Sequence, residues 1–291
     1  MIVSDITGGL GNQMFQYACS YALAKKRNDQ YKIDVSHLSV EYQKNSKIKT
    51  PRKYQLKYFN ITADILPTLS IEENNLLKKA IGRLYRYFRM GSLFRTSFIR
   101  DRDPWAYHPE QLNYKKNAYF CGFWQSWHYF DEYKDDIKRE FQIQENILST
   151  EAQGLIRNCR EAVGIHIRRG DYKVCDNWLI NERFYVDALR CIKRSLGKSI
   201  DILVFCDEPG FAEELFQGEK NIRYITAEQR YTDLEEFAIL SACKHHIISN
   251  STFSWWAAYL GEQDDSITIA PVYNHWNDSY YLNNWIKIDM N

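Results

Sequence analysis

Two adjacent arginines give the clearest sign of chemistry in this chain. Arg168 and Arg169 directly follow the apolar run VGIHI (163–167), which is typical of a buried strand, and Gly170 and Asp171 come next. Ligands bind at the carboxyl ends of strands in open α/β sheets. A planar guanidinium makes bidentate, charge-assisted bonds to phosphoryl oxygens. The order of residues therefore predicts a phosphate-binding turn, and two solvated arginines are the alternative for a bare Arg-Arg pair.

A glycine-rich turn near the start of the chain is a second candidate. Gly8, Gly9, Gly11 and Asn12 follow an expected strand (2–6) and open an expected helix from Asn12 to about residue 27. Glycines allow close backbone approach to a ligand, and the amides at a helix start favour an anion. Met14 stands where GxGxxG needs its last glycine, and no GxxxxGK occurs, so neither an NAD fingerprint nor a P-loop is predicted. A purely structural turn is the alternative.

Short polar side chains form a third candidate between a strand (245–249) and a helix that opens near Thr252. Asn250, Ser251 and Thr252 can hold a diphosphate there with the backbone amides of the helix start. Plain N-capping is the alternative, although it needs only one such residue. The adjoining Trp255 and Trp256 are expected to pack rather than to stack on a sugar.

These strings together resemble a known enzyme family. HIRRGDY (166–172), GGLGNQMFQYA (8–18) and CKHHIISNSTFSWWAAYL (243–260) are similar to motifs of glycosyltransferase family 11. That family contains the α-1,2-fucosyltransferases, which transfer L-fucose from GDP-fucose. The resemblance implies a GT-B-like α/β fold of two Rossmann-like domains facing a central cleft. It also implies inversion at the sugar, a galactose-terminated glycan as acceptor, and Gly9, Gly11 and Asn12 in the cleft near the sugar.

The resemblance assigns Arg168 to the leaving GDP, where its charge offsets the charge that develops on the β-phosphate. Such a pair at about 4 Å gains roughly 4 kcal/mol at an effective dielectric near 20. His166 shares the strand face of Arg168 and is expected to support nucleotide binding, whereas Arg169 points the other way and is expected to pair with Asp171. Asp171, Asp176 and His108 are open alternatives for the group that takes the acceptor proton. No metal or other cofactor is expected.

Two further carboxylates are expected at the same sheet edge. Asp233, with Glu235 and Glu236, lies at a helix start, where the dipole alone can explain an acid. An acid there also suits the N1 and N2 hydrogens of guanine, and Asp233 is the residue expected to bind them. Asp207 ends the strand DILVFC (201–206), where the family more often has Ser-Asp-Asp, so this match is partial.

The order of elements predicts two α/β domains, 1–150 and 151–291. In the second, strands at 163–168, 201–206, 222–226, 245–249 and 267–271 alternate with helices at 182–196, 211–216 and 232–243, as in a parallel, doubly wound sheet. Asn181 and the Thr232–Glu235 capping box are expected helix starts. The first half adds strands at 31–35 and 119–124 and helices at 71–88 and 129–141.

Composition narrows the class of protein. The 291 residues are 45% hydrophobic and carry 38 basic against 37 acidic side chains, so charge gives no reason to expect a nucleic-acid partner. Seven scattered cysteines without a CxxC pair favour neither a disulfide framework nor a zinc site, and fit a reducing cytoplasm. No apolar run approaches the length of about 18 residues that a spanning helix needs, and no signal peptide is expected.

Three patterns receive other interpretations. Asp101 and Asp103 spell DxD, but in an irregular segment where chance is the better explanation. His245 and His246 are adjacent on a strand and face opposite ways, so they cannot form one ligand pair. The segment 78–102 carries eight basic residues and interleaved aromatics. It is either a solvated helix face or a peripheral contact with the inner face of a membrane.

The leading prediction is a metal-independent, cytoplasmic α-1,2-fucosyltransferase for surface glycans such as O-antigen or capsule. An enzyme of the related α-1,6 or protein O-fucosyl branches is one alternative. A non-catalytic sugar-nucleotide or glycan-binding protein is the other.

Overall fold

The computed structural model describes residues 1–45, 51–66, 96–114, 117–174, 178–225, 231–272 and 279–289. They form two compact units. The first covers Met1–Gln142, and the second covers Ile143–Trp276 and Tyr281–Asn291. Ser279 and Tyr280 belong to the first unit, where the Tyr280 ring lies 6.2 Å from that of Phe15. The chain therefore returns to its first unit near its end, which the division into 1–150 and 151–291 did not foresee.

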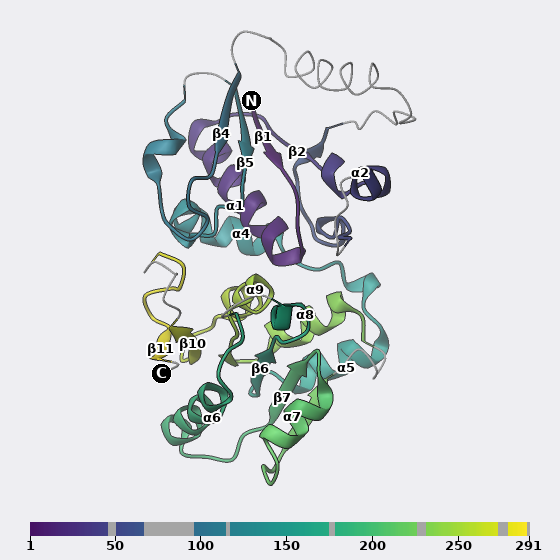
Figure 1. Ribbon diagram of the computed structural model, residues 1–291, viewed down its shortest axis with the longest axis vertical. Coiled ribbons are helices and arrows are strands. Elements are labelled where there is room, and N and C mark those ends of the chain that lie inside the picture. The colour runs from purple at the N-terminus through teal and green to yellow at the C-terminus, as the bar shows by residue number, and fades with distance from the viewer. Residues whose placement is uncertain are drawn as a thin grey trace. The chain divides into compact units, whose positions relative to one another are not determined.

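The first unit is built on a parallel sheet (Figure 1). Its strand order is β3-β2-β1-β5-β4. The strands are β1 (Ile2–Asp5), β2 (Tyr31–Asp34), β3 (Asp64–Ile65), β4 (Thr96–Arg100) and β5 (Asn117–Cys121). The helices are α1 (Leu10–Arg27), α2 (Val40–Asn45) and α4 (Lys134–Glu140). From β1 the chain extends the sheet one way through β2 and β3, while β5 and β4 lie on the other side.

The second unit is also built on a parallel sheet, with strand order β11-β10-β9-β6-β7-β8. The strands are β6 (Val163–Ile167), β7 (Ile202–Cys206), β8 (Ile222–Ile225), β9 (His245–Ile247), β10 (Thr268–Val272) and β11 (Ile286–Asp289). The helices are α5 (Thr150–Asn158), α6 (Glu182–Leu196), α7 (Pro209–Leu215), α8 (Asp233–Ala242) and α9 (Thr252–Gly261). The order reverses between β6 and β9, and ligands bind at such a switch point in open α/β sheets.

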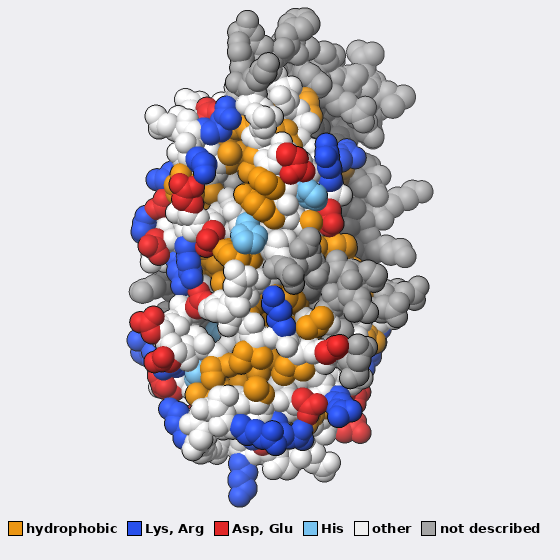
Figure 2. Space-filling model, turned by 90° about the vertical axis from the view of Figure 1, so that its left-hand side faces the viewer, with side chains coloured by type: hydrophobic (Ala, Val, Ile, Leu, Met, Phe, Trp, Pro, Cys, Tyr) orange, Lys and Arg blue, Asp and Glu red, His pale blue; other side chains and the backbone are white. Residues whose placement is uncertain are grey.

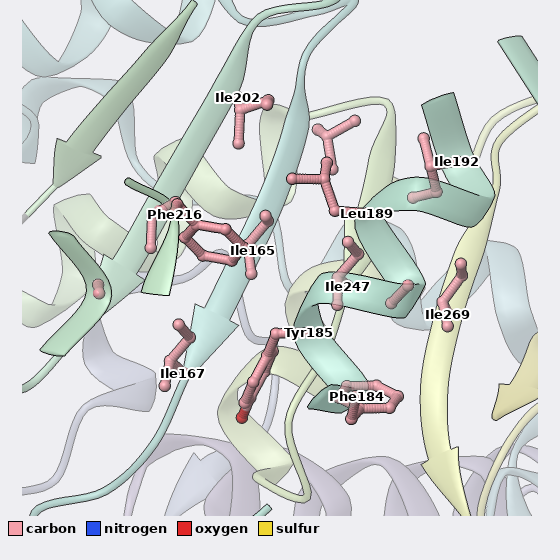
Figure 3. Close-up of a cluster of buried hydrophobic side chains, with 14 of the residues drawn as sticks. Ile165, Ile167, Phe184, Tyr185, Leu189, Ile192, Ile202, Phe216, Ile247 and Ile269 are labelled. Carbon is pink, nitrogen blue, oxygen red and sulfur yellow. The ribbon is translucent and has the colours of Figure 1, made fainter. Parts of the chain in front are cut away.

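Alternation along β6 explains how this strand serves both packing and chemistry. Val163, Ile165 and Ile167 enter a hydrophobic cluster with the buried face of α6, which Figure 3 shows around Tyr185 and Leu189. Successive side chains of a strand point to opposite faces. Gly164 accordingly faces α8 on the other side, where a Cβ would come within 2.6 Å of Leu240 Cδ1. The missing side chain lets α8 pack closely on the strand.

Local signals set several helix ends as predicted. The Asn181 side chain accepts a hydrogen bond from the Arg183 N–H at the start of α6, and Thr232 and Glu235 form the complete capping box of α8. The helix expected at 211–216 begins earlier, at Pro209, because proline is well suited to a first helical turn. The expected strand at 119–124 is β5, and the helix expected at 129–141 is the shorter α4. The helix expected at 71–88 lies outside the described residues.

The side of the molecule shown in Figure 2 carries side chains of both charges. Lysine and arginine side chains are interspersed with acidic ones over the described part of that side, with hydrophobic side chains between them. This mixture agrees with the net charge of +1. Among the described helices, none is long and apolar enough to cross a membrane.

Candidate functional site

The switch point of the second sheet brings together two of the predicted motifs. β6 ends at Ile167, directly before Arg168, and its neighbour β9 ends at Ile247, three residues before Asn250. Parallel strands end at the same sheet edge, so the arginine turn and the polar loop meet there although about 80 residues separate them.

His166 links the two motifs. Its Nδ1 lies 2.9 Å from Ser249 Oγ, and its ring stacks on that of Phe253 with the centroids 5.3 Å apart. Burial lowers the pKa of His166 to about 3, and the positive charge of Arg168 adds to the effect. The imidazole is therefore neutral at physiological pH and a poor proton acceptor, and its contact with Ser249 connects the two motifs.

Two carboxylates hold the Arg168 guanidinium. Its Nε and Nη2 donate to Asp171 Oδ1 at 3.0 and 2.9 Å, and its Nη1 lies 3.0 Å from Asp207 Oδ2. These contacts use three of the five N–H groups of an arginine. One N–H on each terminal nitrogen is left without a partner among the described residues. A preoriented pair of donors of this kind suits two oxygens of a phosphate.

Asp207 also fixes the backbone of the turn. It accepts hydrogen bonds from the backbone N–H groups of Arg169 and Gly170, at 2.9 and 3.0 Å. A Cβ on Gly170 would lie 2.8 Å from Asp207 Oδ2, so the glycine permits this close approach. Asp207, a predicted substrate-binding residue, thus contacts the turn itself in this structure.

Arg169 does not pair with Asp171, and that expectation was wrong. Its Nε donates to Glu208 Oε2 at 3.1 Å, and its guanidinium lies 3.6 Å from the centre of the Phe211 ring. Lys173 also forms an ion pair with Glu208, and this pair lowers the pKa of that carboxyl. Alternation explains the difference, because Arg168 and Arg169 leave the strand on opposite sides and meet different carboxylates.

The polar loop after β9 divides its side chains between capping and support. Ser251 is the N-cap of α9 and accepts from the N–H of Phe253 at 3.3 Å. Asn250 is buried, and its Nδ2 donates to the backbone oxygen of Trp178 at 2.8 Å. Thr252 is the first residue of α9. This helix begins at the same sheet edge as Arg168, because β9 and β6 are neighbours. The helix dipole favours an anion at that end.

Glu236 is a site residue that the sequence did not single out. Asp233, the predicted acid, is exposed, and Glu235 is occupied by its capping box and by the Ser149 N–H. Glu236 is half-buried, and its carboxylate has no hydrogen-bond or ion-pair partner among the described residues. Burial raises its pKa to about 7, with the negative charges of Asp233 and Asp207 adding to the effect and Arg168 opposing it. A helix start permits an acid at several positions, so only packing shows which of them is partly buried within reach of the Arg168 charge.

The glycine turn lies at the matching edge of the first sheet, after β1. Gly8 has φ +77°, which favours glycine, and a Cβ there would lie 2.9 Å from Asn12 Nδ2. Asn12 Oδ1 accepts from Gln125 Nε2 at 2.9 Å. Gln125 follows β5, which pairs with β1 on the side away from β2, so the order of the first sheet reverses between β1 and β5. Gly9 is the N-cap of α1 with open space around its Cα, and Gly11 is buried in the first turn.

Two glutamines of the same motif form hydrogen bonds with the backbone of neighbouring loops. Gln13 donates to the backbone oxygens of Gly8 and Lys53 and accepts from the Gln55 N–H, all within 3.0 Å. Gln16 accepts from the Thr7 N–H at 2.9 Å. Much of the GNQMFQ string therefore fixes the turn and a neighbouring loop rather than a ligand.

The same edge carries a histidine–aspartate pair that sequence reasoning missed. His37 Nδ1 lies 2.6 Å from Oδ1 of the buried Asp5, and the Tyr42 ring packs on the imidazole. Asp5 ends β1 and His37 follows β2, so the pair forms through strand adjacency across 32 residues. Nothing in the local sequence around either residue signals it.

The side chains of the DxD pattern and of the adjacent histidines form hydrogen bonds within the protein. Asp101 accepts from the backbone N–H groups of Phe123 and Trp124, and Asp103 from that of Trp105. His246 bonds the Leu240 carbonyl, while His245 accepts from the Ile267 N–H. The described residues contain no group of three His, Cys, Asp or Glu side chains that could hold a metal ion. Asp176 and most of the basic segment 78–102 lie outside the described residues.

The chain is similar in sequence to known glycosyltransferases. Residues 96–289 match the family model described as Glycosyl transferase family 11. An α-1,2-colitosyltransferase of Escherichia coli is 31% identical over 99% of both chains. The O-antigen biosynthesis glycosyltransferase WbnK of the same species is 31% identical over 92% of this chain and 93% of its own. Human galactoside α-(1,2)-fucosyltransferase 1 is 24% identical over 88% of this chain and 64% of the human protein.

Solved structures share the fold. A mutant of Arabidopsis thaliana FUT1 in complex with GDP superimposes with a TM-score of 0.54 at 12% identity, covering 97% of this chain and 74% of that one. NodZ α-1,6-fucosyltransferase soaked with GDP-fucose gives 0.50 at 14% identity, covering 89% and 91%. The predicted class, a GT-B-like α/β chain of two Rossmann-like units, is confirmed.

Proposed function

Because the chain belongs to glycosyl transferase family 11, we propose that it transfers L-fucose from GDP-fucose to the 2-hydroxyl of a terminal galactose, with inversion. The acceptor belongs to a surface glycan such as O-antigen or capsule, which fits the O-antigen relative. The observation that carries the donor half of this proposal is the Arg168 guanidinium, held by Asp171 and Asp207 at the switch point.

The proposed reaction breaks the bond between fucose C1 and the β-phosphate oxygen, and GDP leaves with the electron pair. The acceptor oxygen bonds to C1 from the opposite side and loses its proton. Arg168 stabilises the charge that develops on the leaving phosphate, and its two carboxylates keep it oriented, so little reorganisation is needed in the transition state. Asp171 and Asp176 remain the predicted catalytic carboxylates, with His108 as the alternative proton acceptor.

The remaining donor contacts are proposed from the same sheet edge. Ser251, Thr252 and the start of α9 would hold the diphosphate, and His166 would support the turn beneath it. We propose Glu236 rather than Asp233 as the partner of the guanine N1 and N2 hydrogens, because its carboxylate is half-buried and has no hydrogen-bond or ion-pair partner among the described residues, whereas Asp233 is exposed. Gly9, Gly11 and Asn12 remain proposed contacts on the acceptor side.

A second donor is favoured by one comparison. The α-1,2-colitosyltransferase is more similar to this chain than the fucosyltransferases named above, and colitose is fucose without its 3-hydroxyl. Both donors require the same chemistry at Arg168. They differ in one hydroxyl of the transferred sugar.

One assay tests these possibilities together. The purified chain is mixed with lactose and either GDP-fucose or GDP-colitose, released GDP is measured, and the linkage of the product is determined by NMR. We expect GDP release that depends on lactose and a new α-1,2 linkage with GDP-fucose. Faster turnover of GDP-colitose would move the proposal to the second donor. GDP bound without turnover of either donor would indicate a sugar-nucleotide-binding protein.

A further inference from the structure

A tryptophan is exposed close to the candidate site. Trp178 keeps 37% of its surface accessible, and its neighbour Leu179 keeps 39%. The segment that carries them runs from the arginine turn to the start of α6 at Glu182. Single exposed apolar residues are common and need no special explanation. Trp178 differs because its backbone and ring are both held in place.

Two contacts fix Trp178. The buried amide of Asn250 donates to the Trp178 backbone oxygen at 2.8 Å. The ring meets Tyr172 edge-on, with centroids 5.1 Å apart and planes at 85°. Tyr172 itself reaches the Asn250 backbone oxygen with its hydroxyl at 3.5 Å. An aromatic ring held in this way can bind a ligand without a large loss of conformational freedom.

The Tyr172 ring connects Trp178 to Arg168 of the candidate site. The Arg168 guanidinium carbon is 5.9 Å from the centre of the Tyr172 ring. The Trp178 ring contacts the same Tyr172 ring edge-on. If a phosphate oxygen bonds Arg168, the transferred sugar occupies the next position outward. The acceptor sugar follows it. We place the acceptor sugar on the Tyr172 side of Arg168, where the exposed Trp178 ring would be its neighbour.

The chemistry of the ring selects the kind of ligand. Galactose has an axial 4-hydroxyl, so its C–H groups at carbons 3, 4 and 5 gather on one apolar face. Such a face packs on the π-surface of an indole, and aromatic side chains supply large apolar contact areas. Resting on the proposed function, we propose that Trp178 binds the apolar face of the acceptor galactose and that Asn250 is the positioning residue for this subsite.

The test compares acceptor and donor kinetics in matched variants. Trp178→Ala is expected to raise the KM for lactose about 10–100-fold, the scale of losing one buried aromatic contact. The KM for GDP-fucose should stay within about twofold, because the donor contacts lie at other residues. Trp178→Phe should recover most of the affinity. Leu179→Ala, equally exposed and adjacent, is the control and should leave both constants within about twofold.

Asn250→Ala tests the positioning role. It should raise the KM for lactose, and combining it with Trp178→Ala should add little, because both changes remove the same contact. A rise in the KM for GDP-fucose instead would place Asn250 on the diphosphate and overturn its assignment here. Thermal melting checks that each variant folds, and Trp178→Leu, which is apolar but has no π-surface, provides the test if Trp178→Ala unfolds.

Calorimetry separates this inference from the proposed function. Lactose is titrated into the wild type and Trp178→Ala in the presence of GDP, so no transfer is required. Loss of lactose binding in Trp178→Ala supports the subsite even if neither donor is turned over. An unchanged lactose KM and affinity in Trp178→Ala would overturn it. Equal changes for donor and acceptor, or the same effect in Leu179→Ala, would overturn it as well.

Discussion

At the scale of single residues, the main result is that the candidate site pairs each arginine with its own carboxylates. Arg168 is held by Asp171 and Asp207, and Arg169 by Glu208. The two side chains are adjacent in sequence and identical in chemistry, yet Arg168 lies between two carboxylates, whereas Arg169 pairs with Glu208 alone and packs on the Phe211 ring. Their different roles come from the two faces of one strand.

Replacing Arg168 should therefore affect turnover more than stability. Arg168→Ala is expected to lower kcat by about 10²–10³-fold, the scale of losing one preorganised transition-state donor. Arg168→Lys should also be slow, because an ammonium cannot reproduce the planar fork. The measurement is steady-state kinetics with GDP-fucose and lactose, with thermal melting to check the fold.

Arg190→Ala provides the matched control. This arginine is exposed on α6 and pairs with Asp187 there. It should keep normal turnover and a normal melting temperature. Near wild-type kcat in a well-folded Arg168→Ala would show that the assignment of Arg168 is wrong.

Glu236 gives a prediction with a defined pH dependence. Its pKa is raised from 4.5 to about 7 in the folded chain, chiefly by burial. A raised carboxyl pKa means that the ionised form destabilises the fold. The penalty is absent below about pH 4.5, where the group is protonated in folded and unfolded chains, and complete above about pH 7. Glu236→Gln should therefore raise the melting temperature at pH 8 but not near pH 4.5.

The same substitution, Glu236→Gln, should weaken the binding of GDP-fucose. An ionised carboxylate accepts the guanine N–H groups better than an amide does, so Glu236→Gln should raise the KM for GDP-fucose at pH 8. In the wild type this KM should rise as the pH falls below about 7. Asp233→Asn, one turn away and exposed, serves as the control. If Asp233→Asn rather than Glu236→Gln weakens donor binding, Asp233 is the residue that binds guanine, as the sequence predicts.

At the scale of elements, missing side chains let the helices of the second unit approach one another and the sheet. Gly164 lets α8 pack closely on β6, and Gly261 at the end of α9 packs against the end of α8. A Cβ on Gly261 would lie 2.2 Å from the backbone oxygen of Ser241. A backbone atom of a packed helix end cannot move aside as a flexible side chain can.

Gly261→Ala should thus destabilise the fold by about 1–3 kcal/mol, the usual scale of overpacking a core. The control is Gly154→Ala in α5, where a Cβ meets nothing within 4 Å. That change should be neutral or stabilising by up to about 1 kcal/mol, since alanine favours helix more than glycine. Urea denaturation measures both. Equal effects at the two positions would contradict the packing explanation.

At the scale of the whole molecule, two predictions concern what else the enzyme needs. Activity should persist within about twofold in EDTA, because the Arg168 guanidinium supplies the positive charge that a metal ion would otherwise bring to the diphosphate. The assay is GDP release with and without the chelator. A loss of more than about tenfold that Mn²⁺ or Mg²⁺ restores would return attention to Asp101 and Asp103.

The second concerns the basic segment 78–102, which lies mostly outside the described residues. If it contacts an anionic membrane, the chain should sediment with vesicles containing anionic lipid at low salt and dissociate at high salt. Binding should weaken when Arg83, Arg86 and Arg89 become Gln. No sedimentation at low salt, or no effect of those changes, would leave a solvated helix face as the explanation.

The sequence by itself determined the class of fold, the family and the arginine turn. Strands and helices alternate with clear local signals, and caps such as Asn181 and the Thr232–Glu235 box depend on neighbouring residues alone. Arg168 was predictable because a buried strand and a turn place it at a sheet edge. The exact bounds of the strands were less predictable, because strands such as β3 and β11 are short and are stabilised by pairing with a neighbouring strand.

Only the tertiary structure decided which charged groups meet. The Arg168–Asp207 pair, the His37–Asp5 pair and the contact of Asn250 with Trp178 each join residues 32 to 72 positions apart. Strand order sets these contacts, and strand order depends on how two sheets bury their faces as a whole. Glu236 illustrates the same limit, since a helix start favours several acids alike, and only the packing of α8 beside β6 partly buries this one within reach of the Arg168 charge.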